Sequence, residues 1–170
     1  MTSSDSTDTD DDREPDVVVR PIGYVEPFPV VRRIGDRELS LGNKFAACPD
    51  RLTACPDRHD RTFEYVLSAT SDPYPLTTHH HPLIDGPGNE WNAFEGAVDD
   101  ARRLYERDGS LLVHCKAGIS RSSTIIATTL AAEDGLGFHD ALAIVQEARP
   151  IATPHPALHE LAVVYLAANG

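Results

Sequence analysis

The feature that most constrains the fold is a short apolar run joined by a tight polar loop to a long apolar segment. Residues 110–115, Ser-Leu-Leu-Val-His-Cys, lack polar alternation, which is typical of a central strand buried on both faces. Residues 121–135 are apolar nearly all round and predict a buried helix. Because open α/β sheets bind ligands where a strand ends and a helix begins, the sequence predicts a ligand site between them.

The remaining segments predict strands before residues 110–135 in the sequence, and helices both before and after them. Apolar runs predict strands at 16–20, 37–43, 63–70 and 77–83. Apolar residues at three- and four-residue spacing predict helices at 91–104, 138–149 and 155–169, and we expect Gly109 and Pro150 to end the first two. We therefore expect an α/β domain with a central, mostly parallel sheet flanked by helices.

The first sixteen residues differ in composition from the rest. They are rich in Ser, Thr and Asp and lack apolar periodicity, so we expect a disordered acidic tail at 1–16 and one folded domain at 17–170. The tail is the reverse of a secretory signal, and the apolar runs are too short to span a bilayer. Three cysteines do not make a disulfide framework. These features predict a cytoplasmic protein with reduced thiols.

The charge of the chain is strongly acidic. It has 27 acidic and 15 basic residues, a net charge of -12, and only two lysines, Lys44 and Lys116. Such a charge disfavours binding to nucleic acid and stable association with anionic membranes. An acidic, lysine-poor, alanine-rich composition resembles halophilic archaeal proteins, in which molar salt screens self-repulsion. An acidic mesophilic protein is the alternative.

The loop after the central strand combines a cysteine with groups that bind an oxyanion. Its backbone N–H groups enter a helix N-terminus, where the helix dipole adds positive charge. Gly118 permits a sharp turn, and Arg121 offers a planar fork suited to two oxygens. Because these donors also stabilise a thiolate, we expect the pKa of Cys115 to be lowered. A thiolate facing a bound phosphate is a nucleophile aimed at phosphorus.

Residues 114–122, His-Cys-Lys-Ala-Gly-Ile-Ser-Arg-Ser, match the His-Cys-x-x-Gly-x-x-Arg-Ser signature of the cysteine-based protein tyrosine phosphatase superfamily. They most resemble its dual-specificity branch. Stretches at 39–43 and 148–158 are similar to further family segments, so the resemblance covers roughly residues 37–168. It implies hydrolysis of phosphotyrosine, phosphoserine and phosphothreonine in proteins through a phosphocysteine intermediate, without metal or cofactor. We also expect a monomer.

The resemblance implies roles along the motif. Cys115 would attack phosphorus, Arg121 and the loop amides would hold the phosphate oxygens, and Ser122 would hydrogen-bond the departing thiolate. The phosphate-binding loop would consist of Lys116, Ala117, Gly118, Ile119, Ser120 and Arg121. His114 is expected either to brace this loop or to be a plain strand residue.

A leaving alkoxide or phenolate needs a proton, so a general acid is required. Family members carry an aspartate some thirty residues before the cysteine, and Asp85 lies thirty residues before Cys115. Its segment, Leu-Ile-Asp-Gly-Pro-Gly-Asn, predicts a loop tip able to reach across a cleft. Asp85 is therefore the predicted acid. Its rivals are Glu90, which a helix N-terminus explains, and Asp99 and Asp100, which a solvated helix face explains.

The presence of Lys116 in the loop leaves two classes of substrate possible. Its side chain is either solvated or in contact with a second phosphate. The second reading would favour phosphoinositides, phospholipid head groups or other small phosphorylated molecules, although the neutral Ile119 and Ser120 weaken a lipid interpretation. A sulfurtransferase, an arsenate-reductase-like enzyme or an inactive phosphate-binding module is a third class. The loop's length and position and the retained Cys115, Arg121 and Asp85 argue against it.

The other cysteines raise two weaker hypotheses. Cys48, Cys55 and His59, with the histidines at 79–81, could bind a metal, but Cys-x6-Cys-x3-His is not a standard zinc spacing. A disulfide from Cys48 or Cys55 to Cys115 would regulate the nucleophile. We expect an ordinary loop instead, and a strand for the three histidines, one of which could line the mouth of the cleft.

Overall fold

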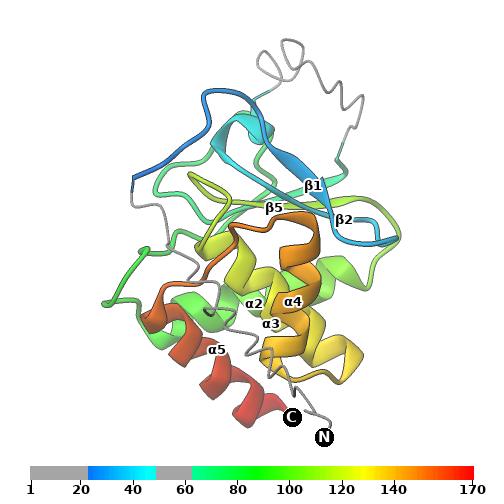
Figure 1. Ribbon diagram of the computed structural model, residues 1–170, viewed down its shortest axis with the longest axis vertical. Coiled ribbons are helices and arrows are strands. Elements are labelled where there is room, and N and C mark those ends of the chain that lie inside the picture. Colours follow the sequence, from blue (N-terminus) through cyan, green and yellow to red (C-terminus); the bar gives the residue numbers. More distant parts are fainter. Residues whose placement is uncertain (1–22, 49–62) are drawn as a thin grey trace, which may run out of the picture.

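The computed structural model describes residues 23–48 and 63–170 (Figure 1). The predicted tail at 1–16, the predicted strand at 16–20, Cys55 and His59 lie outside these residues. The described elements are β1 (Val31–Arg33), β2 (Leu39–Gly42), the 3-10 helix η1 (Lys44–Ala47), β3 (Tyr65–Ser68), β4 (His79–His80), α2 (Trp91–Tyr105), β5 (Leu111–His114), α3 (Arg121–Asp134), α4 (Phe138–Ala148) and α5 (Pro156–Asn169). No helix in this part of the chain is long and apolar enough to cross a membrane.

The strands form one sheet in the order β1-β2-β5-β3-β4. All neighbouring strands are parallel except β1 and β2, which are antiparallel. Val113 of β5 pairs with Leu41 of β2 on one side and with Leu67 of β3 on the other. The mostly parallel sheet is thus confirmed, and Cys115 directly follows its central strand.

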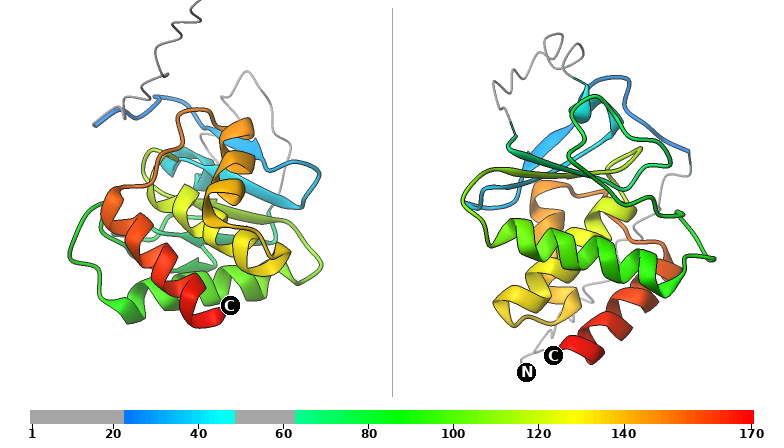
Figure 2. Two further views of the ribbon diagram at one scale, coloured as in Figure 1. Left: turned by 60° about the horizontal axis from the view of Figure 1, so that its bottom comes forward. Right: turned by 180° about the vertical axis from the view of Figure 1, so that it is seen from behind.

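The helices cover one face of the sheet, as Figures 1 and 2 show. Side chains alternate along β5, so Leu111 and Val113 join the main core with the helices, while Leu112 joins a smaller core on the opposite face. Ala46 and Ala47 of η1 complete that smaller core. The predicted helices therefore form a single layer, and the short η1 segment packs against the other face.

α3 lies at the centre of the helical layer and is buried from Ser122 to Ala131. It contacts α2, α4, α5 and β5. Its buried hydroxyls bond to carbonyls one turn earlier, as Thr128 Oγ1 does to Thr124 O at 2.7 Å. The prediction of a buried helix directly after the strand is confirmed. Thr128 and Thr129 bond to carbonyls within the helix, whereas the hydroxyls of its first turn bond to the preceding loop.

Two elements differ from their predictions. β1 was not predicted, because an edge strand of three residues with two arginines carries no periodic apolar signal. The predicted strand at 77–83 contracts to His79–His80, which pairs with β3 alone at the sheet edge. The helix predicted at 91–104 is confirmed: α2 ends at Tyr105, and a turn and bend follow it up to Gly109.

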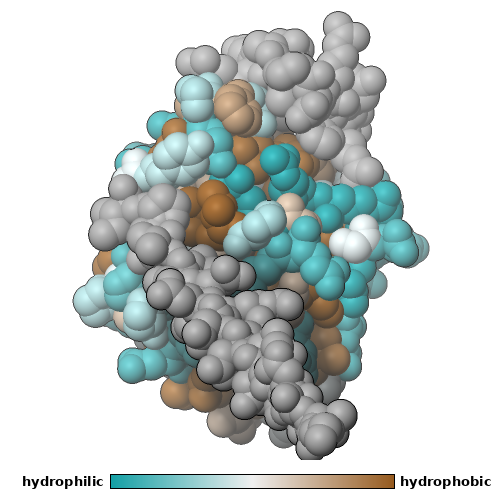
Figure 3. All heavy atoms as spheres, viewed as in Figure 1, coloured by the Kyte–Doolittle hydropathy of each residue, from teal (hydrophilic) through white to brown (hydrophobic). Residues whose placement is uncertain are grey.

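Hydrophilic side chains dominate the face shown in Figure 3, where hydrophobic ones are scattered. Among the described residues, the exposed large hydrophobic side chains are Tyr24, Phe28, Ile84, Val163 and Val164. Tyr24 also lines the pocket above Cys115.

Candidate active site

The loop from Cys115 to Arg121 is held against β2 by its backbone. The Cys115 N–H donates to Gly42 O at 3.3 Å, and the Lys44 N–H donates to Lys116 O at 3.1 Å. Gly118 has a φ of 66°, and a Cβ there would lie 3.0 Å from Gly42 O. Only glycine fits this turn without strain, because both the dihedral angle and the neighbouring backbone exclude a side chain.

The Cys115 thiol is buried at the base of the loop, and its Sγ lies 3.2 Å from Ser122 Oγ. Burial raises its pKa, but the charge of Arg121, the Ser122 hydroxyl and the backbones of Ser122 and Ile119 outweigh that effect. The pKa of Cys115 is therefore lowered, which enlarges the fraction present as the nucleophilic thiolate.

Arg121 is fixed by two segments beside the cysteine. Its Nη1 donates to Ala69 O at 3.3 Å and to Leu83 O at 3.1 Å. Ala69 follows β3, and Leu83 precedes the loop that carries Asp85. These bonds involve one nitrogen of a guanidinium that has five N–H donors, so the fork can still meet an oxyanion.

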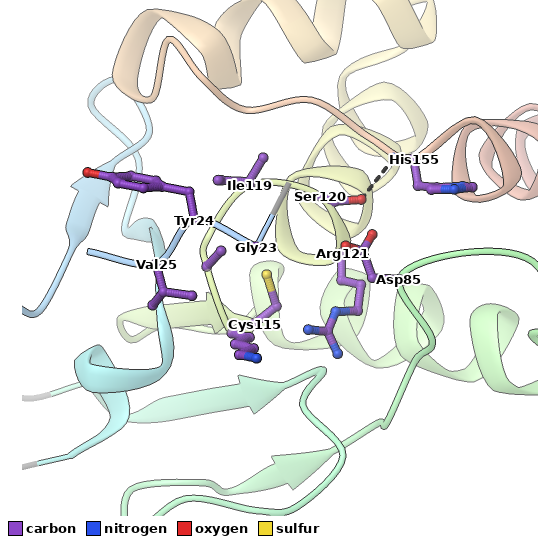
Figure 4. A pocket seen from close by; sticks show the side chains of 11 residues that line it. Gly23, Tyr24, Val25, Asp85, Cys115, Ile119, Ser120, Arg121 and His155 are labelled. Atoms are coloured by element: carbon purple, nitrogen blue, oxygen red, sulfur yellow. Dashed lines mark hydrogen bonds between the residues drawn. The ribbon is translucent and has the colours of Figure 1, made fainter. Parts of the chain in front are cut away.

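Asp85 lies at an exposed loop tip and lines the same pocket as Cys115 and Arg121; Figure 4 shows its side chain beside that of Arg121. Asn89 closes this loop: its Nδ2 donates to Ile84 O, and the Ile84 N–H donates to its Oδ1, both at 2.8 Å. Sequence reasoning missed this bracket, although an asparagine after Gly-Pro-Gly is a turn signal.

The rival acids lie elsewhere. Glu90 is the N-cap of α2, Asp99 accepts from Tyr165 Oη at 2.6 Å, and Asp100 pairs with His81. None of the three lines the pocket. We expected Asp99 and Asp100 to lie on a solvated helix face. Instead, Asp99 links α2 to α5, and Asp100 links α2 to the segment after β4.

The pocket above Cys115 has a volume of about 460 Å³ (Figure 4). Its floor is the loop after β5, from which Lys116, Ala117, Ile119 and Ser120 take part in the lining. Tyr24 and Val25 form one wall, and His155 forms another. A pocket of this size, in which apolar surface meets several convergent polar groups, is typical of small-ligand sites.

Arg149 binds the backbone of the loop that follows β5, a contact that sequence reasoning missed. Its Nε donates to Gly118 O at 3.1 Å and its Nη2 to Ala117 O at 3.0 Å. The guanidinium also forms a bidentate pair with Glu26, at 2.7 and 3.0 Å. Burial raises the pKa of Glu26, but the bonds from Arg149 outweigh it and the pKa is lowered. The pair ties the segment that carries Tyr24 to the loop after β5.

The segment before α5 supports the loop from the other side. The Thr153 N–H donates to Ile119 O, and the His155 N–H donates to Ser120 Oγ, both at 2.8 Å. Nδ1 of His155 accepts from the Ala157 N–H at 3.0 Å and so caps α5. This explains why the Thr-Pro-His-Pro stretch lies at the site.

His114 is buried beneath the loop. Its Nε2 lies 2.5 Å from Ser68 Oγ, which lies 2.6 Å from Thr77 Oγ1, and the Tyr74 ring packs edge-on against it. Burial lowers the pKa of His114 to about 4, against an opposing effect of the Cys115 backbone. The imidazole is therefore neutral at pH 7. This placement fits the predicted bracing role.

The histidines at 79–81 and Cys48 do not form a metal site with other described residues. Within residues 23–48 and 63–170, no three His, Cys, Asp or Glu side chains gather to hold a metal ion. His80 Nε2 lies 2.8 Å from Thr70 O, and His81 pairs with Asp100. Cys48 is partly exposed, with its Sγ 3.6 Å from Lys44 O.

Known proteins share this arrangement. The model of the dual specificity phosphatase catalytic domain matches residues 58–165. Dual specificity protein phosphatase 15 of Homo sapiens is 46% identical over 101 residues, covering 56% of this chain and 34% of that protein. The Mus musculus protein of the same name is 44% identical over 128 residues, covering 72% and 52%. The chain thus spans about a third to a half of the length of these relatives.

Solved structures show the same fold. The crystal structure of DUSP15 is 28% identical, with a TM-score of 0.64, over 82% of this chain and 89% of that one. That of human DUSP28 is 24% identical, with a TM-score of 0.66, over 83% and 97%.

Proposed function

The chain belongs to the dual-specificity phosphatase family, and on that premise we propose that it hydrolyses phosphotyrosine, phosphoserine and phosphothreonine in proteins through a phosphocysteine intermediate. The observation that carries this proposal is the setting of Cys115. Its thiol lies at the base of the pocket, 3.2 Å from Ser122 Oγ, with a lowered pKa and the charge of Arg121 beside it.

In the first step, the Cys115 thiolate attacks phosphorus in line with the leaving oxygen. The S–P bond forms and the P–O bond to the substrate breaks. Arg121 and the loop N–H groups hold the other three oxygens, so the developing charge meets donors already in place. Asp85 protonates the leaving oxygen, which departs as an alcohol or phenol.

In the second step, water attacks the phosphocysteine. Asp85, now a carboxylate, takes a proton from the water as the new P–O bond forms and the S–P bond breaks. The Ser122 hydroxyl hydrogen-bonds the departing thiolate, which lowers the free energy of that leaving group. Inorganic phosphate leaves, and the enzyme returns to its starting protonation state.

The nucleophile is tested by hydrolysis of an aryl phosphate. We expect Cys115→Ser to abolish turnover, because a serine hydroxyl at this position remains protonated. Cys48→Ser is the matched control, since Cys48 does not line the pocket, and it should retain wild-type turnover. Activity that survives in Cys115→Ser would refute the mechanism.

The acid is tested by the pH profile of Asp85→Asn. We expect turnover of a phosphoserine peptide, whose leaving group is poor, to fall by about 10²- to 10⁴-fold. An activated aryl phosphate should suffer less, and the decline of the wild-type rate at high pH should disappear. Glu90→Gln is the control and should keep the wild-type profile. If Glu90→Gln changes the profile and Asp85→Asn does not, the assignment is wrong.

A phosphatase for phosphoinositides, phospholipid head groups or other small phosphorylated molecules is the second candidate. The observation that favours it is the exposed Lys116, at the edge of the pocket. Hydrolysis rates on phosphopeptides and on soluble inositol phosphates, compared at equal concentration, decide between the two. We expect the phosphopeptides to react faster.

The same proposal extends to the oligomeric state and the cellular environment of the enzyme. A net charge of -12 and a reactive thiol suit a monomer that meets phosphorylated proteins in a reducing cytoplasm, without binding nucleic acid or membranes. Sedimentation of the purified chain tests the monomer, and mass measurement of its thiols from freshly lysed cells tests the redox state.

A further inference from the structure

A second pocket, of about 200 Å³, adjoins the proposed active site. Its lining residues are Lys44, Thr70, Ser71, Asp72, Pro73, Tyr74, Lys116 and Arg121. Lys116 and Arg121 line both pockets, so the two are neighbours along the catalytic loop. A substrate whose phosphate sits above Cys115 could therefore place an adjacent group in the second pocket.

Both lysines of the chain meet at this second pocket. The fold brings them together, because the Lys44 N–H donates to Lys116 O where η1 meets the catalytic loop. Neither side chain forms an ion pair with a carboxylate of residues 23–48 or 63–170. Most other cations described in the chain are tied to acceptors; Arg102, for example, is bonded to Glu133.

The charge of this pocket is opposite to that of the whole chain. Three cations, Lys44, Lys116 and Arg121, line it with one carboxylate, Asp72, which gives a formal excess of two positive charges. The chain as a whole has a net charge of -12. A local positive site in an acidic protein attracts anions selectively, because the remaining surface repels them.

We infer that this pocket is a subsite for a second anionic group, a carboxylate or a phosphate, that flanks the phosphorylated residue of a peptide substrate. The inference rests on the proposed function and adds a substrate preference to it. Lysine suits such a role, because its ammonium is a compact charge with three donors on a flexible stem, and so it can meet anions at varied positions.

The walls of the first pocket favour a peptide over a lipid head group. Tyr24, Val25 and Ile119 present apolar surface where a side chain and its backbone would lie. Ser120, the other variable position of the loop, is engaged by the His155 N–H. An inositol ring would instead present hydroxyls to these apolar walls and leave them without partners.

The test measures peptide binding to the inactive Cys115→Ser protein by fluorescence polarisation. One phosphotyrosine peptide carries acidic residues on both sides of the phosphorylated residue, and a second carries amides there. We expect the acidic peptide to bind about fivefold more tightly, the effect of one partly exposed ion pair. Adding Lys44→Gln should remove this preference, whereas adding Asp72→Asn should increase it.

Arg107→Gln is the matched control. It also removes one positive charge, but Arg107 follows α2, at the opposite end of the sheet from Cys115, so it should leave the preference intact. Equal binding of the two peptides, or an equal loss of the preference in Lys44→Gln and Arg107→Gln, would overturn the subsite. Either result would leave the proposed function standing, because hydrolysis of the amide peptide by the wild-type protein tests that function separately.

A final arm distinguishes the source of the second anion. Vesicles of phosphatidylcholine with a bisphosphorylated phosphoinositide are offered to the same Cys115→Ser protein. We expect binding weaker than that of the acidic peptide. Tighter binding to the vesicles that Lys44→Gln abolishes would assign the pocket to a lipid head group and refute the peptide assignment.

Discussion

The pKa values of two adjacent residues, His114 and Cys115, are both lowered by their surroundings. Burial disfavours charge on both: it is the largest cause of the lowered pKa of His114, about 4, whereas for Cys115 it opposes the lowering of the pKa. The positive charge of Arg121 lowers both pKa values. The result is a neutral imidazole directly before a thiol whose pKa is lowered. One arginine thus serves both the nucleophile and the residue beneath it.

The neutral His114 predicts an acid-sensitive fold. Its pKa is near 6.5 when unfolded and about 4 when folded, so as pH falls the unfolded chain takes the proton first and is favoured. Between pH 8 and pH 5 this single group should cost about 2 kcal/mol of unfolding free energy. Urea denaturation at pH 8 and at pH 5 measures this loss. From pH 8 to pH 5, the unfolding free energy of His114→Gln should fall by about 2 kcal/mol less than that of the wild type.

The exposed His139→Gln is the control for this measurement, and it should follow the wild type. An identical pH dependence of stability in the wild type and in His114→Gln would show that His114 does not titrate between these limits.

At the scale of elements, the catalytic loop is shaped by segments that are distant in the sequence. β2 holds its backbone from one side, the segment before α5 holds it from another, and the Glu26–Arg149 pair joins it to the chain before β1. The loop itself carries Cys115 and Arg121, while these contacts fix the path of its backbone. Pre-formed donors need no reorganisation as charge develops on the phosphate.

Gly118→Ala should damage the loop far more than a typical glycine substitution. A positive φ and backbone atoms 3.0 to 3.2 Å from the new Cβ leave no room to relax. We expect about 1–3 kcal/mol of destabilisation and a large loss of phosphate affinity, measured by thermal melting and by competitive inhibition with inorganic phosphate. Gly96→Ala, inside α2 with its nearest neighbour at 3.8 Å, should instead be neutral or stabilising. Comparable melting of both variants would contradict this reasoning.

Arg149→Met should cost about 3–5 kcal/mol, because it leaves the Glu26 carboxylate buried without its partner. The double variant Glu26→Leu/Arg149→Met should recover part of that stability, since no buried charge remains. It should not recover phosphate affinity, because the donors to Ala117 O and Gly118 O are still missing. Recovery of both stability and affinity would mean that the pair does not position the loop. Denaturant melts and phosphate inhibition separate the two effects.

At the scale of the whole molecule, a net charge of -12 on 170 residues should make stability depend on salt. Raising KCl from about 0.1 to 2 M shortens the Debye length from about 10 to 2 Å and should screen self-repulsion, so we expect the melting temperature to rise. Sucrose of equal osmolality is the control, because it favours the compact state without screening charge. A melting temperature that is unchanged or lowered by KCl would argue against the halophilic interpretation.

The sequence by itself determined the central unit of the fold. Residues 110–135 read as strand, loop and buried helix because burial on all sides leaves a continuous apolar signal, and the structure confirms each part. The positions of Cys115, Arg121 and Ser122 in that unit were also predictable, because the motif is contiguous. Asp85 could be proposed because the family resemblance implies an aspartate some thirty residues before the cysteine, and its neighbours predict a loop there.

Only the tertiary structure decided which distant residues meet at this loop. Glu26 and Arg149 are separated by 123 positions, and Lys44 and Lys116 by 72, so no local pattern in the sequence connects them. Their pairing depends on the order of the strands, which places β2 beside β5 and thereby brings η1 and the chain before β1 to the catalytic loop. Local periodicity specifies elements, because it reflects which side of each segment is buried. Long-range contacts depend on how those elements pack, and that information lies in the whole chain at once.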